Sequence, residues 1–121
     1  MKLEELQIGD WVMFKNKYTR IKRTSKSLID TTDFYEILPS QIEPIPITPE
    51  ILEKNGFVTE TINGYSSYEL DTRWGSILFY PGTEYYINIQ TVGYQYKGLI
   101  KYVHELQHAL RLCKIDKEIV L

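Results

Sequence analysis

The dipeptide Asn63-Gly64 stands between two runs of strand-like composition, Val58–Ile62 and Tyr65–Leu70. Both central residues of a type I′ turn need a positive φ angle, and asparagine and glycine adopt that angle at the least cost. This stretch therefore predicts a β-hairpin, which commits the middle of the chain to antiparallel sheet. Two further pairs of runs predict hairpins of the same kind: Trp11–Lys15 with Tyr18–Arg23 around Asn16-Lys17, and Ser76–Tyr80 with Glu84–Gln90 around Pro81-Gly82-Thr83.

Two other stretches carry helix signals. Thr48 can cap a first turn, and Pro49 at the first helical position lacks only an amide that would stay unpaired there. Asn55-Gly56 ends this segment, which predicts a short helix at about 48–55. A helical period also runs from about 98 to 113, with an apolar stripe on one side of the wheel: Leu99, Tyr102, Val103, Leu106, Ala109, Leu110 and Cys113.

These elements predict an α+β fold: an antiparallel sheet of hairpins with one short helix (about 48–55) and a C-terminal amphipathic helix (about 98–113). The length of 121 residues predicts a single domain over residues 1–121. A net charge of -2 disfavours a partner such as long nucleic acid. The single cysteine, Cys113, allows no intrachain disulfide, and no signal core or membrane span is present, so a cytoplasmic protein without membrane contact is expected.

Residues His104 to His108 read His-Glu-x-x-His, the spacing of two zinc ligands and a general base in metallopeptidases. In that interpretation His104 and His108 bind zinc, and Glu105 activates the bound water. A catalytic zinc site needs a third protein ligand, and the chain has only two histidines. The wheel places both imidazoles opposite the apolar stripe, beside Lys101 and Arg111. We therefore expect a solvated or partner-facing helix face without a cofactor, with a small zinc-dependent hydrolase as the alternative.

The same helix face predicts a ligand site. Cations and histidines follow one another along it, and tyrosines of the neighbouring strands can add aromatic rings. Such a combination suits a small anionic or nucleotide-like ligand, because cations hold phosphates and rings stack on bases. The predicted ligand-binding residues are Lys97, Lys101, His104, His108, Arg111, Tyr85, Tyr94 and Tyr96. Homo-oligomerisation through the tyrosine-bearing strands, or through the edge at Pro44–Pro46, is a third expectation.

Two segments carry a resemblance to a known group: Ile45–Phe57, which reads IPITPEILEKNGF, and Ile100–Gln107, which reads IKYVHELQ. The chain resembles small uncharacterised proteins of Bacteroidetes genomes, their phages and mobile elements, which carry "PIPLTPEILEKNGF"-like and "YVHxLQ"-like motifs. The group itself implies no activity, but small phage proteins sequester host signalling nucleotides or block host defence proteins. By that analogy we expect a non-enzymatic, phage-type protein that binds such a nucleotide or such a host protein. In that group His104 and Gln107 would be the marked positions, and the pairing of Glu105 with His108 would be incidental.

Overall fold

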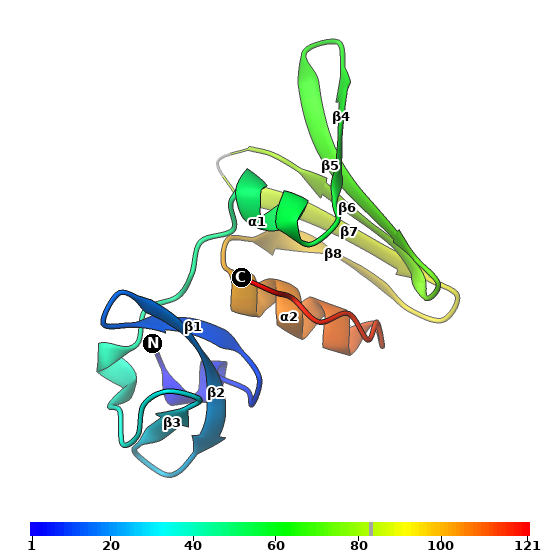
Figure 1. The fold of residues 1–121 in the computed structure, drawn as a ribbon. Coiled ribbons are helices and arrows are strands. Elements are labelled where there is room, and N and C mark those ends of the chain that lie inside the picture. Colours follow the sequence, from blue (N-terminus) through cyan, green and yellow to red (C-terminus); the bar gives the residue numbers. More distant parts are fainter. Residues whose placement is uncertain (83) are drawn as a thin grey trace. The chain divides into compact units, whose positions relative to one another are not determined.

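A computed structural model describes residues 1–82 and 84–121 of the chain (Figure 1). The chain divides into two compact units. The first holds Met1–Pro46 with Tyr102–His104, and the second holds Ile47–Lys101 with Glu105–Leu121. All sheet pairing is antiparallel, as expected, but it forms two sheets where one was predicted. The expectation of a single domain stays a prediction.

The first unit is built on a three-stranded sheet of β1 (Trp11–Phe14), β2 (Lys17–Thr24) and β3 (Ile29–Thr31). The predicted β1–β2 hairpin is confirmed, but its turn lies at Lys15 and Asn16, which have φ angles of 50° and 61°. Two short 3-10 helices, η1 (Leu3–Glu5) and η2 (Pro39–Gln41), complete the unit. Its core consists of Leu6, Val12, Phe14, Ile21, Ile29, Ile37 and Ile42.

The segment from Ile42 to Pro46 is extended but makes only isolated bridges. Met13 and Glu43 form one bridge, and Pro46 and Tyr102 form another. The Val103 amide also donates to the Ile45 carbonyl oxygen at 2.8 Å. Proline has no amide to give to a ladder, which explains why this segment does not continue as a regular strand.

The second unit contains a five-stranded meander in the order β4-β5-β6-β7-β8. Its core face includes Ile77, Phe79, Ile87 and Ile89, which have no exposed surface. The predicted hairpin at Asn63-Gly64 is confirmed, with φ angles of 52° and 80°. Thr83, in the next predicted turn, lies outside the described residues. The strands are β4 (Val58–Ile62), β5 (Tyr65–Thr72), β6 (Gly75–Tyr80), β7 (Tyr85–Thr91) and β8 (Gln95–Ile100).

The short helix α1 (Pro49–Lys54) forms where its capping signals predicted it. Thr48 Oγ1 accepts a hydrogen bond from the Ile51 amide at 3.2 Å, so the hydroxyl does cap the first turn. Gly56 follows with a φ angle of 90°, the left-handed conformation that ends many helices. Phe57 then packs edge-on against Phe79 of β6, with ring centroids 5.2 Å apart.

The C-terminal helix α2 spans Val103–Leu112, so the predicted start at about 98 is wrong. Residues 98–100 belong to β8 instead, where Ile100 pairs with Tyr85 and Gly98 with Ile87. Gly98 contributes little to a helix, and the ladder to β7 supplies hydrogen bonds that the sequence pattern does not reveal. Leu99 is consequently 62% exposed and is not part of an apolar helix stripe.

Tyr102 of the predicted stripe precedes the helix and is half-buried. The later members of the stripe are buried as expected: Val103, Leu106, Ala109, Leu110 and Cys113. The expectation that both imidazoles face solvent is wrong for His104, which is 6% exposed. His104 lies next to the bridge of Tyr102 with Pro46, and its ring stacks on Tyr102 with centroids 5.9 Å apart. His108 is half-buried. No helix among the described residues is both long and apolar enough to cross a bilayer.

Candidate functional site

The predicted basic stripe does not lie on one helix. Lys97 is on β8, and Lys101 lies between β8 and α2, so only the histidines and Arg111 are on the helix. Tyr96 and Lys97 are consecutive strand residues and therefore point to opposite faces of the sheet. The structure thus does not align these cations in the way the helical wheel suggested. Ligand binding by the individual residues stays a prediction.

The three predicted tyrosines also differ in their surroundings. Tyr94 is exposed in the turn before β8, whereas Tyr85 packs against Phe79 at a centroid distance of 5.7 Å. Burial raises the pKa of the Tyr85 phenol above its usual value, and the nearby Tyr68 and Glu50 raise it further. Tyr85 therefore belongs to the packed side of the sheet, away from the face that carries Lys97.

Glu105, the predicted general base, has a structural role at the start of α2. Its Oε1 accepts a hydrogen bond from the Lys101 amide at 2.9 Å, which satisfies a donor that precedes the helix. The described residues contain no group of three or more His, Cys, Asp and Glu side chains placed to hold a metal ion. The zinc alternative stays a prediction.

A different set of side chains gathers on the outer face of the first unit. Along β2, Thr19 and Ile21 are buried, so Tyr18 and Arg20 point the other way. Lys22 follows at an irregularity of the β2–β3 register and is exposed. On β1, Val12 and Phe14 are buried, which turns the alternate residues outward. The resulting β1–β2 face consists of Trp11, Met13, Tyr18, Arg20 and Lys22.

The strand register pairs rings with cations on this β1–β2 face. Trp11 lies directly opposite Arg20, and the guanidinium carbon is 5.3 Å from the indole centroid. Arg20 Nε also donates to the Gly9 carbonyl oxygen at 3.0 Å, which fixes the guanidinium over the ring. Such a contact is worth about 0.5–1 kcal/mol at an exposed site. The face therefore holds a preformed pair of ring and cation.

A second pair of the same type extends the surface. Lys22 Nζ lies 5.8 Å from the Tyr35 centroid, and Tyr35 is 63% exposed. Tyr18, which is 46% exposed, sits opposite Met13. Glu43, the bridge partner of Met13, is exposed. The surface thus combines aromatic and cationic side chains.

The sequence does carry a signal for this surface, because residues 15–26 contain six cations and no acid. The cations are Lys15, Lys17, Arg20, Lys22, Arg23 and Lys26. Its members are not equivalent. Lys17 Nζ is 3.2 Å from Asp33, and Arg23 Nε is 3.2 Å from Asp30. The prediction missed this surface because the overall charge of -2 hides a local cluster.

Comparison of the chain with protein-family models, curated proteins and solved structures gives no match. The resemblance to phage and mobile-element proteins stays a prediction.

Proposed function

We propose that this chain is a non-enzymatic binding protein whose β1–β2 face binds a small nucleotide-like anion. The observation that carries the proposal is the cross-strand pair of Trp11 and Arg20, with Tyr18 on the same strand face and the exposed Lys22 two residues after Arg20. A cytoplasmic location and a phage-type role in sequestering a host nucleotide belong to the same proposal.

In this proposal the aromatic rings stack on the base of the ligand, and the cations bind its phosphate. Stacking of a base on an aromatic side chain is worth about 1–3 kcal/mol and does not depend on base identity. Arginine and lysine add charge-assisted hydrogen bonds to phosphate oxygens. Trp11 is half-buried and Arg20 is anchored to Gly9, so little side-chain freedom is lost on binding.

The size of the ligand follows from the charge. A long polymer requires many phosphate contacts, whereas this chain carries a net charge of -2. Within residues 15–26, Lys17 and Arg23 are paired with aspartates. A ligand with one or two phosphates needs only the cations of the β1–β2 face.

Tryptophan fluorescence tests the proposal directly. The chain has two tryptophans, so a Trp74→Phe variant leaves Trp11 as the sole reporter. We expect saturable quenching by adenosine monophosphate and by a dinucleotide, with weaker binding of inorganic phosphate, which has no ring to stack. In that background Lys22→Glu should weaken binding about tenfold, while Lys54→Glu on α1 in the second unit is the matched control.

The fluorescence titrations test nucleotide binding, stacking on Trp11 and the size of the ligand separately. Absence of saturable quenching by nucleotides, or equal affinity after Lys22→Glu, would overturn it. Phosphate binding as tight as nucleotide binding would exclude the stacking role of Trp11. A single-stranded oligonucleotide that binds far more tightly, with a steep salt dependence, would replace the small ligand by a polymer.

A further inference from the structure

β4 is the outermost strand of the five-stranded sheet and is exposed along its whole length. Val58 is 69% exposed and Ile62 is 60% exposed, which is unusual for β-branched apolar residues in a strand. No other strand pairs with the outer edge of β4 among the residues that the structure describes. Proteins commonly protect such an edge, because it offers unpaired backbone groups to any extended chain.

The register identifies the backbone groups that point outward. Ile62 and Tyr65 flank the two-residue turn and so form the first hydrogen-bonded pair of the hairpin. Hydrogen-bonded and non-hydrogen-bonded pairs alternate along an antiparallel ladder. Glu60 and Val58 therefore also bond to β5, whereas the amides and carbonyls of Thr59 and Thr61 face the open edge.

The hairpin also extends beyond its neighbour in the sheet (Figure 1). Pairing of β5 with β6 ends at Tyr68 and Phe79, so residues 65–67 have β4 as their only partner strand among the described residues. Tyr65 at the tip is 83% exposed. A two-stranded ribbon is marginally stable in water, and a third strand would stabilise it.

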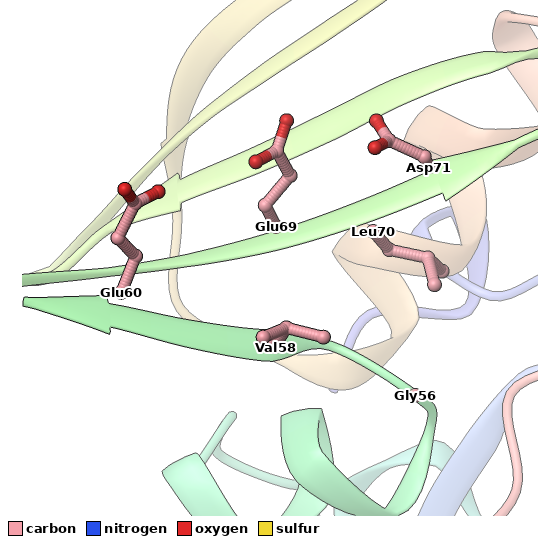
Figure 2. A pocket seen from close by; sticks show the side chains of 6 residues that line it. All are labelled: Gly56, Val58, Glu60, Glu69, Leu70 and Asp71. Carbon is pink, nitrogen blue, oxygen red and sulfur yellow. The ribbon is translucent and has the colours of Figure 1, made fainter.

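A hollow of about 430 Å³ lies beside this edge, and Figure 2 shows the side chains that line it. Glu60 of β4 and Glu69 and Asp71 of β5 contribute three carboxylates along it. Its other described lining residues are Gly56, Val58 and Leu70, and no lysine or arginine is among the described residues of the lining. The edge therefore combines free backbone groups with exposed apolar side chains and a negative potential.

We propose that the edge of β4 binds an extended, lysine- or arginine-bearing segment of a partner protein by β-strand addition. The partner strand bonds to the backbone of Thr59 and Thr61. Its alternate side chains meet Val58 and Ile62, and a cationic side chain enters the hollow at Glu60. Backbone bonds supply affinity in such complexes, and the side-chain contacts supply specificity.

Charge selects this occupant over a second copy of the chain. The antiparallel self-pairing that uses all outward groups sets Thr59 opposite Thr61 of the other copy and centres on Glu60. The two Glu60 carboxylates would then lie directly opposite each other, which destabilises a ladder. Glu69 and Asp71 add further negative charge next to them.

The test uses the full chain and a fluorescent synthetic valine–lysine peptide of about seven residues, in which threonine alternates with valine, lysine and valine, so that one strand face presents a lysine between two valines. Thr61→Pro removes one outward amide and no bond to β5, since proline is accepted at edge positions whose amide faces solvent. Thr61→Ala is the control, because it loses the hydroxyl contact of Thr61 with Ser66 at 3.1 Å but keeps the amide. An unchanged melting temperature in both variants establishes that they fold.

We expect the valine–lysine peptide to bind in fluorescence anisotropy and Thr61→Pro to weaken it about tenfold, with Thr61→Ala close to the parent. Glu60→Lys should abolish binding. Equal binding of the same peptide with proline in place of each threonine would overturn the proposal, because that peptide cannot pair as a strand. Failure of the valine–lysine peptide to bind, or equal binding to Thr61→Pro, would also overturn it. Self-association that disappears in Thr61→Pro would make a second copy the occupant.

Discussion

The side chain of Asn55 and the backbone of Val120 hold each other through two hydrogen bonds. Asn55 Nδ2 donates to the Val120 carbonyl oxygen at 2.8 Å, and the Val120 amide donates to Asn55 Oδ1 at 2.8 Å. Nδ2 also donates to the Ile51 carbonyl oxygen at 2.8 Å. Because Asn55 is 3% exposed, water does not replace these bonds. One buried amide thus joins the C-terminal segment to the end of α1.

Asn55→Ala should therefore lower the free energy of unfolding by about 2–3 kcal/mol, because the Val120 and Ile51 groups lose their partners. Asn55→Asp should cost more, since a carboxylate would face two carbonyl oxygens. Urea unfolding followed by circular dichroism measures both values. Val120→Pro removes the donating amide, and the double variant Asn55→Ala/Val120→Pro completes a double-mutant cycle. If the losses in the free energy of unfolding of the two single variants add up to the loss in the double variant, the two residues are not directly coupled.

Three glycines should respond differently to alanine. At Gly75 an added Cβ would lie 2.2 Å from the Gln90 carbonyl oxygen, so the backbone must shift. We expect a loss of about 3 kcal/mol or more in the free energy of unfolding. At Gly64 the Cβ meets open space but φ is +80°, and the loss should be about 1–2 kcal/mol.

Gly93→Ala is the control for this series, because nothing lies within 4 Å of an added Cβ. Its effect should stay within about 0.5 kcal/mol. Thermal and urea unfolding of the three variants measure their stabilities, and we expect the order Gly93→Ala, Gly64→Ala, Gly75→Ala from most to least stable. A Gly75→Ala protein as stable as Gly93→Ala would show that the β6–β7 pairing differs from the one described.

The elements that the sequence predicted well depend on neighbours in the chain. Helix α1 follows from Thr48, Pro49 and Gly56, whose effects are local capping and backbone conformation. The β4–β5 hairpin follows from Asn63-Gly64 in the same way. For both, the physical cause lies within a few residues, so no knowledge of the tertiary structure is needed.

The elements that the sequence predicted poorly depend on distant partners. Residues 98–100 fit a helical period but pair with β7, and that ladder overrides the local pattern. His104 is buried next to Tyr102, whose bridge partner Pro46 is more than fifty residues away in the chain. A helical wheel shows which residues share a face, but it cannot show how many faces are covered. For that reason the predicted cations do not share one helix face, and their binding of a ligand stays a prediction.

Burial of His104 leads to a prediction about metals. Its ring stacks on Tyr102, and Glu105 bonds to the Lys101 amide, so both residues have structural contacts that need no ion. We expect chelation by EDTA to leave the melting temperature unchanged. His104→Ala should lower the free energy of unfolding by about 2 kcal/mol, because it leaves a cavity. His108→Ala, at a half-buried position, should cost less.

Elemental analysis of untagged protein completes this test. Stoichiometric zinc that is lost in His108→Ala, together with a drop in melting temperature on chelation, would contradict the structural account of His104 and Glu105. That result would make the zinc-dependent hydrolase the leading hypothesis. Hydrolysis of a peptide or ester substrate that requires Glu105 would then be the decisive assay.

Alkaline pH should destabilise the protein through Cys113 and Tyr85. Burial raises the pKa of the Cys113 thiol above its usual value of 9.0, and burial is also the main cause that raises the pKa of Tyr85 above 10.0. In each case the unfolded chain loses its proton first as the pH rises. The free energy of unfolding therefore falls from the unfolded pKa up to the folded pKa, and the full contribution of each group is present below its unfolded pKa.

Urea unfolding across a pH series that brackets both values measures this slope. Cys113→Ala should make the decline just above 9.0 shallower, and Tyr85→Phe should do the same above 10.0. Each variant is compared with its own stability at neutral pH, which removes the cost of the lost side chain from the comparison. Tyr94→Phe is the control for the loss of a tyrosine hydroxyl at a position that is 48% exposed. A decline with the same slope in Cys113→Ala and the parent would mean that the thiol titrates alike in the folded and unfolded chains.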